Sequence, residues 1–144
     1  SRGHSWGPRV SPDGSRLYVA LSDDAQQQQT DRDAIVVIDT RTNRISARFE
    51  AGTDPEQFAV SPDGRWLYSS NEDAGTASIT DTRNGRVLAT LVVGIEPEGV
   101  AVSPDGRWVY VTAETSNTVS VIDTQSREVV SAFLVDARPR AAVL

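Results

Sequence analysis

Paired charged residues flank a proline at regular intervals in this chain. The pairs are Asp54 and Glu56, Glu96 and Glu98, and Arg138 and Arg140, and the matching positions nearer the N-terminus are His4 and Trp6. Carboxylates from neighbouring units can bind a hard cation or accept a basic partner. Guanidiniums can clamp a carboxylate or phosphate through two parallel hydrogen bonds. The same residues can also form a solvated ring of ion pairs, each of which contributes little.

His4 is the single histidine of the chain. It can serve as an axial haem ligand, as a general base, or simply as a surface histidine. No second histidine completes a zinc site, and no cysteine is present. No GxSxG motif supports a nucleophilic serine. We therefore assign no catalytic residue.

The elements that must position these residues are marked by a repeated turn. Ser-Pro-Asp-Gly occurs at Ser11–Gly14, Ser61–Gly64 and Ser103–Gly106. Proline presets φ for the second turn position, aspartate caps the turn, and glycine takes a positive φ. A short apolar run precedes the second and third copies, and a β-rich run follows each copy, which predicts hairpins.

The even spacing of Asp39, Asp81 and Asp123 gives the repeat a period of about 42 residues, which is the length of a propeller blade. Pro55, Pro97 and Pro139 follow the same spacing. The first unit holds eight additional residues between Tyr18 and Asp39, including the glutamine run 26–29. We interpret this insertion as a loop. The alternative interpretation is that the loop contacts a partner.

Four short strands per unit predict an all-β propeller with four-stranded blades. We place blade 1 at about 5–51, blade 2 at about 52–93, blade 3 at about 94–135, and the inner strand of a fourth blade at about 140–144. Each blade face of roughly 300 Å² that stays uncovered would lose on the order of 8 kcal/mol of hydrophobic stabilisation. We therefore expect a larger ring, completed by a longer chain or by oligomerisation.

Because strands alternate in direction, the constant turns should share one rim and the variable loops the other. The variable loops and the segments around the three prolines should surround the channel mouth, where propellers commonly bind ligands. Trp66 and Trp108 follow the constant turn and are expected to pack at a blade edge. Asp39, Asp81 and Asp123 are expected to cap the last hairpin turn through backbone N–H groups.

The net charge of −6 argues against a nucleic-acid partner. No apolar run approaches the ~20 residues of a transmembrane helix. Absence of cysteine excludes disulfides without assigning a compartment.

The third unit, with Tyr110–Ala113 in its second strand, resembles the YVTN-type β-propeller repeat. The strings at 54–59, 71–75, 96–100 and 137–140 resemble propellers associated with pyrroloquinoline quinone (PQQ)-dependent alcohol catabolism. That resemblance implies an exported bacterial protein, typically seven-bladed, located in the periplasm or secreted.

The function we expect is a non-enzymatic binding or scaffold propeller associated with quinoprotein alcohol oxidation. A protein or a small molecule would bind at the channel mouth, with PQQ or a divalent cation as the associated cofactor. The alternatives are a lactonase-type propeller with a metal at the channel mouth, and a haem-carrying propeller related to cytochrome d1.

Overall fold

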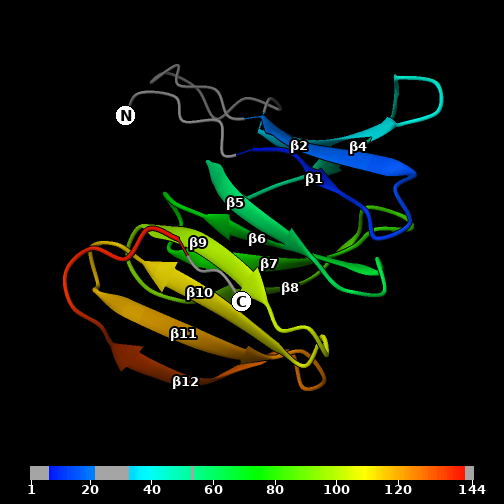
Figure 1. Ribbon diagram of the computed structural model, residues 1–144. Helices are drawn as coiled ribbons and strands as arrows, with labels where there is room; N and C mark the ends of the chain where they lie inside the picture. The colour runs from blue at the N-terminus through cyan, green and yellow to red at the C-terminus, as the bar shows by residue number, and fades with distance from the viewer. Residues whose placement is uncertain (1–6, 22–32, 53, 142–144) are drawn as a thin grey trace.

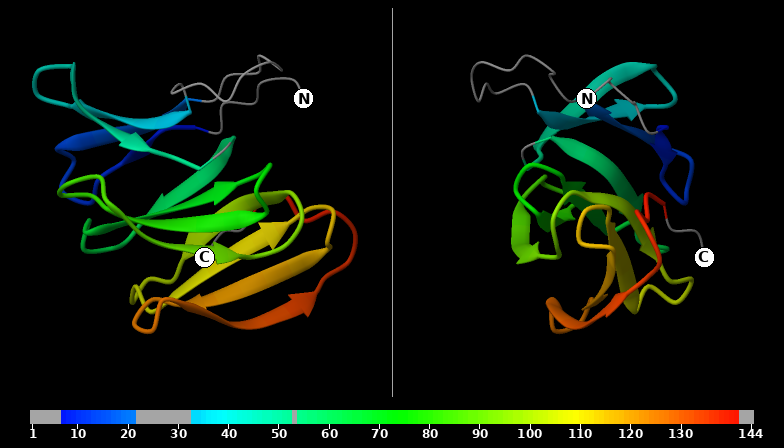
Figure 2. Two further views of the ribbon diagram at one scale, coloured as in Figure 1. Left: turned by 180° about the vertical axis from the view of Figure 1, so that it is seen from behind. Right: turned by 90° about the vertical axis from the view of Figure 1, so that its left-hand side faces the viewer.

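The computed structural model describes residues 7–21, 33–52 and 54–141. Within these ranges the chain forms only strands, turns and loops, and no helix that could cross a membrane is found there. Three four-stranded antiparallel sheets follow one another along the chain and lie face to face (Figures 1 and 2). The all-β blade architecture predicted from the repeat is confirmed.

Each sheet is a simple meander in which consecutive strands pair as neighbours. The strands are β1 (Arg9–Val10), β2 (Arg16–Leu21), β3 (Ala34–Asp39), β4 (Arg44–Glu50), β5 (Pro55–Val60), β6 (Trp66–Asn71), β7 (Thr76–Asp81), β8 (Val87–Val92), β9 (Pro97–Val102), β10 (Trp108–Ala113), β11 (Thr118–Asp123) and β12 (Glu128–Leu134). The first strands of consecutive sheets contact each other, β1 with β5 and β5 with β9. β1, β5 and β9 are therefore the inner strands.

The core lies between the sheets, because successive residues of a strand point to opposite faces. Leu67 faces the first sheet and packs with Tyr18, Ile35 and Phe58. Tyr68, the next residue, belongs to the cluster shared with the third sheet. The central sheet thus buries both faces, whereas β12 at the far side of the third sheet exposes Val130, Phe133 and Leu134.

The Ser-Pro-Asp-Gly turns form as predicted, and they also touch one another across blades. Gly14, Gly64 and Gly106 have φ of 73°, 73° and 72°. A Cβ added to Gly64 would lie 3.4 Å from Cδ of Pro12, and one added to Gly106 would lie 3.4 Å from Cδ of Pro62. Each turn therefore rests against the turn of the preceding blade, and we call this end of the molecule the turn rim.

The aspartates at the end of the third strands cap the last hairpin turns, as predicted. Oδ1 of Asp39 accepts from the backbone N–H of Arg41 at 2.8 Å, and Oδ1 of Asp81 accepts from that of Arg83 at 2.9 Å. Oδ1 of Asp123 accepts from the backbone N–H of Gln125 at 2.8 Å. The pKa of each aspartate lies below its usual value: a hydrogen bond from Arg65 is the largest cause at Asp81, the backbone bond from Arg41 is the largest at Asp39, and at Asp123 backbone bonds and the charge of Arg107 outweigh burial.

Two predicted features fall partly or wholly outside the described residues. His4, Trp6 and the glutamine run lie in undescribed segments. Of the predicted fourth inner strand, Arg140 and Ala141 are described without strand structure, and residues 142–144 are not described. The path up to residue 141 does continue the repeat, because the backbone of Arg140 and Ala141 lies against Gly99.

Substitution of Ser61 tests the hydrogen bonds of the turn, because this serine is only 2% exposed and its hydroxyl group forms two of them. Oγ donates to Asp63 at 2.5 Å and accepts from the backbone N–H of Trp66 at 2.9 Å. Ser61→Ala should lower the free energy of unfolding by about 1–3 kcal/mol in urea titrations, because the partly buried N–H of Trp66 loses its acceptor. Ser103→Ala should behave alike, and Ser126→Ala, at an exposed position, is the control. A loss for Ser61→Ala no larger than the control's would contradict this account.

Candidate functional site

The blade-to-blade segments and the loops between second and third strands meet at the end opposite the turn rim. The N–H of Glu72, after β6, donates to the carbonyl of Asp54 at 3.1 Å. The N–H of Glu114, after β10, donates to the carbonyl of Glu96 at 2.8 Å. These two equivalent bonds join a second-strand loop to the segment before an inner strand, and we call this end the loop rim.

The residue before each repeated proline has a strained backbone that turns the chain into the next inner strand. Asp54, Glu96 and Arg138 have φ of 51°, 54° and 51°. Such values are uncommon for residues other than glycine. The same conformation at all three positions shows that the charged pairs occupy equivalent places at the loop rim.

Three carboxylates gather beside the second blade. Oxygens of Asp54, Glu56 and Glu72 lie within 4.8 Å of one another, and all three side chains are half-buried. Carboxylate oxygens so grouped could coordinate a hard cation such as Ca²⁺. The sequence predicted Asp54 and Glu56 in this site but missed Glu72, which the fold adds from the end of β6.

The pKa of Glu72 is raised from 4.5 to about 7. Burial is the largest cause, followed by a hydrogen bond with Glu56 and by the negative charges of Glu56, Glu96 and Asp73. Below about pH 7, Glu72 therefore holds a proton that it donates to Glu56. Two carboxylates that share a proton in this way are suited to binding a cation in its place.

The third blade repeats this pair of carboxylates as Glu98 and Glu114, but here two arginines pair with one of them. Burial, a hydrogen bond with Glu114 and the charges of Glu114 and Glu72 raise the pKa of Glu98 to about 7. Glu114 is only 3% exposed, and its carboxylate forms ion pairs with Arg138 and, at 3.0 Å, with Arg140. Burial alone would raise the pKa of Glu114, but hydrogen bonds from Glu98 and the two arginines lower it.

Charge is therefore distributed unevenly along the loop rim. At the junction with the fourth unit, Glu114 is neutralised by Arg138 and Arg140. At the junction between the second and third blades, the equivalent carboxylate, Glu72, faces the negative charge of Glu96 instead. The rim thus carries an excess of carboxylates around the second blade.

A pocket of about 510 Å³ opens beside these carboxylates. Glu72, Asp73 and Glu96 line it together with Val92 and Ile95. Val92 is 79% exposed and Ile95 is 61% exposed. The pocket thus presents negative charge next to an apolar surface.

Six of the eight residues predicted for the channel mouth lie at the loop rim, while His4 and Trp6 fall outside the described residues. The structure pairs Arg138 and Arg140 with Glu114, so a clamp on an external carboxylate or phosphate stays a prediction. Sequence reasoning missed Glu72 and Glu114. The two recur at the period of the repeat, each directly after a second strand, and this was the signal that could have identified them.

Comparison with known proteins identifies the family. The sequence profile described as "Cytochrome D1 heme domain" matches residues 21–140. The chain belongs to this family. No curated protein matches the sequence at a significant level.

Solved structures show the same fold. Hydrazine synthase of Kuenenia stuttgartiensis is 29% identical with a TM-score of 0.83, over 95% of this chain and 38% of that chain. The WD40 repeats of RRP9 give 19% identity and a TM-score of 0.78, over 97% of this chain and 42% of theirs. The structure of U3-55K is 19% identical with a TM-score of 0.76, over 97% of this chain and 43% of that chain. The chain therefore spans about two fifths of these structures and forms part of a propeller.

The family raises the question of a haem, and the described residues do not supply its axial ligand. The chain has no cysteine, no methionine and one histidine, His4, which is not among the described residues. Its three tyrosines lie within β2, β6 and β10 rather than at the loop rim. Haem iron is held by histidine, cysteine, methionine or tyrosine in proteins. Within residues 7–21, 33–52 and 54–141, the loop rim thus does not fit a haem site.

The shared protons make stability depend on pH. A carboxyl whose folded pKa is about 7, against 4.5 unfolded, stabilises the fold below pH 4.5, and that contribution is lost as the pH rises to 7. The melting temperature should therefore fall between pH 5 and pH 7.5, and it should fall less in Glu72→Gln/Glu98→Gln. Glu128→Gln, at an exposed position on β12, is the control. Equal slopes in the double variant and the wild type would refute the shared protons.

Proposed function

We propose that this chain is a non-enzymatic binding segment of a β-propeller, and that its loop rim binds a basic partner that also carries apolar side chains. The observation that carries the proposal is the excess of carboxylates around Glu72 beside the exposed side chains of Val92 and Ile95. Lysine and arginine side chains combine a charged head with an aliphatic stem. Such side chains match a pocket in which Glu72, Asp73 and Glu96 adjoin apolar surface.

The wider role that we propose is that of a scaffold in the bacterial periplasm, or of a secreted one, associated with PQQ-dependent alcohol oxidation. Its support is the resemblance of the loop strings at 54–59 and 96–100 to propellers of that kind. Those strings supply Asp54, Glu56, Glu96 and Glu98, four of the rim carboxylates described above.

A basic peptide of alternating lysine and leucine is the probe for this rim. We expect saturable binding by isothermal titration calorimetry, with an affinity that falls steeply with salt because exposed charges are screened. Measured above pH 7, where Glu72 has lost its proton, binding should be weakened about tenfold or more by Glu72→Gln/Glu96→Gln, because each lost charge pair in a partly buried site contributes on the order of 1 kcal/mol. Glu50→Gln/Glu128→Gln removes the same charge at exposed positions and should leave affinity unchanged. No saturable binding, or equal losses in both double variants, would refute the proposal.

A divalent cation is the second candidate, favoured by the grouping of Asp54, Glu56 and Glu72. A lactonase-type enzyme would need such a metal at the channel mouth. Titration with Ca²⁺, followed by a lactone hydrolysis assay with and without Ca²⁺, separates this candidate from the first. Ca²⁺ binding that Glu56→Gln abolishes, together with Ca²⁺-dependent hydrolysis, would replace the binding function by an enzymatic one.

A haem-carrying propeller is the third candidate, favoured by the family. Because the described rim lacks an axial ligand, we expect no saturable Soret change when haem is added to the purified chain. The same titration with His4→Ala is the control for the one imidazole of the chain. A saturable Soret shift in the wild type that is lost in His4→Ala would establish the haem candidate instead.

A further inference from the structure

The third blade leaves uncovered the face that the second blade buries. Tyr68 and Ile79 of the second blade are each 2% exposed, because the third blade packs against them. One repeat later, Tyr110 and Val121 occupy the same positions and are only half-buried. Phe133 of β12 lies on the same side of the sheet and is 48% exposed. We call this side the outer face of the third blade, and no further sheet covers it in the described part of the chain.

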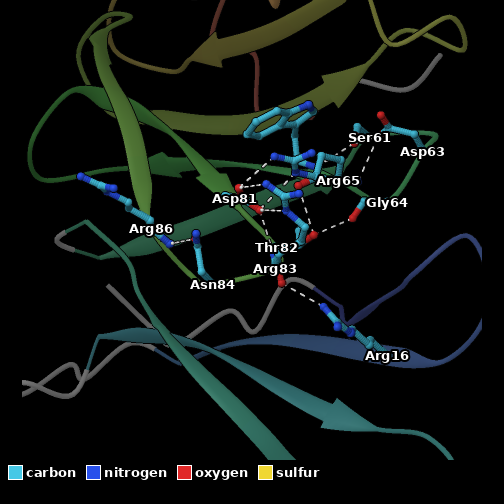
Figure 3. Close-up of polar contacts among 11 residues, drawn as sticks. Arg16, Ser61, Asp63, Gly64, Arg65, Asp81, Thr82, Arg83, Asn84 and Arg86 are labelled. Carbon is cyan, nitrogen blue, oxygen red and sulfur yellow. Dashed lines mark hydrogen bonds and ion pairs between the residues drawn. The ribbon is translucent and has the colours of Figure 1, made fainter.

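A polar group on this outer face also matches the second blade. In the second blade, Arg65 pairs with Asp81 at 3.2 Å and lies over the ring of Trp66, on the face that the third blade covers (Figure 3). In the third blade, Arg107 donates to Asp123 at 2.8 Å and likewise lies over a tryptophan ring, 5.0 Å from its centroid. The outer face of the third blade is therefore organised like a face that packs against another blade.

The first blade lacks a tryptophan at this position. Arg16 stands there instead, lines a pocket of about 350 Å³, and donates from Nη1 to the carbonyl of Thr82 in the second blade at 2.9 Å (Figure 3). The tryptophan type of face thus occurs in the second and third blades. Among the described residues, only that of the second blade is covered by another sheet.

The surface that covers the second blade is a row of aliphatic side chains across the four strands of the third sheet. Its members lie opposite one another on neighbouring strands and pack into the core, and they are Val102, Val109, Ile122 and Val129. The first sheet has an equivalent row, whose members are Val10, Leu17, Ile38 and Ile45. Because Tyr18 packs toward the second sheet, its neighbour Leu17 and the rest of this row point the other way.

This outward row of the first blade is available for contact. Val10 is 57% exposed and Ile45 is 70% exposed. The first blade therefore presents the same kind of aliphatic surface that already covers the second blade, and it presents it at the opposite end of the stack from the outer face of the third blade (Figure 1). Two copies of the chain thus carry matching surfaces.

The inner strands fit the same arrangement. β9 pairs with four residues of β10, whereas the described residues of β1 pair with only two residues of β2. The backbone of Arg140 and Ala141 lies against Gly99, where the inner strand of a following blade would run. In a second copy, this segment can pair with the part of β2 that β1 leaves unpaired in the described chain.

We propose that two copies of this chain join head to tail, with the third blade of each against the first blade of the other. Three sheets from each copy then close a ring of six blades, which is within the range of known propellers. A head-to-tail contact that closes in this way gives a finite assembly rather than a filament. The contact uses neither the carboxylates around Glu72 nor their pocket, so it is independent of the function proposed above.

The buried area favours the closed ring over a single contact. Each face measures roughly 300 Å². Two junctions of two faces each therefore bury about 1,200 Å², which reaches the range of stable protein interfaces. A dimer held by one junction would bury only about 600 Å², which is typical of crystal contacts.

Sedimentation equilibrium of the purified chain tests the proposal, and we expect twice the mass of 15.5 kDa. Phe133→Lys on the third blade and Ile45→Lys on the first blade should each raise the dissociation constant of the dimer at least tenfold, because each would bury an unpaired charge at both junctions. Val92→Lys is the matched control, because Val92 is 79% exposed and belongs to neither face. Its dissociation constant should stay within about twofold of the wild type.

Circular dichroism establishes that each variant is folded, and Phe133→Ser and Ile45→Ser replace a lysine variant that is not. A folded wild-type chain that stays monomeric at about 100 μM would overturn the proposal and leave the outer face to a blade of another polypeptide. Open-ended oligomers would overturn the closed ring. A dimer that Phe133→Lys dissociates but Ile45→Lys does not would show two third blades packed against each other, which also contradicts the head-to-tail contact.

Discussion

Burial of both faces of a sheet between two neighbours is the interaction on which this structure depends. A four-stranded antiparallel sheet alone has no interior, and its apolar residues are buried only when another sheet covers each face. Leu67 and Tyr68 show how a single strand serves both neighbours, since the first side chain packs toward the first sheet and the second toward the third. Stability is therefore shared between adjacent blades, as expected for a repeat protein.

Stacked sheets need a fixed alignment, and the two rims provide it in different ways. At the turn rim, identical Ser-Pro-Asp-Gly turns lie against one another through Pro12 and Gly64, and through Pro62 and Gly106. At the loop rim, backbone hydrogen bonds from Glu72 and Glu114 join each second strand to the segment that leads into an inner strand. Because the backbone carries the contacts at the loop rim, side chains there can vary without loss of the fold.

That freedom explains why the candidate site lies at the loop rim, where consecutive units differ. At the loop rim, equivalent positions hold acids in two units and arginines in the next, so Glu114 is neutralised while Glu72 faces further acids. At the turn rim, Arg16 stands where Trp66 fills the following junction. Membership of the cytochrome D1 heme domain family establishes the framework, and these departures from the repeat are what distinguish the chemistry of this chain.

The sequence by itself determined the period, the strands and the turns. Proline and glycine at fixed positions allow few backbone conformations, and the predicted four strands per unit form in all three sheets. It also placed Asp54, Glu56, Glu96 and Glu98 at one rim, because strand direction alternates.

Only the tertiary structure decided which charges meet. Glu72 and Glu114 are separated in the sequence from Glu56 and Glu98 by a whole hairpin, and their contacts arise because second strands end beside the segments before inner strands. Burial then raises the pKa of Glu72 and of Glu98. The packing of the first blade against the second places Arg16 in the lining of a pocket. Such properties depend on distances between blades, and no local pattern of residues encodes those distances.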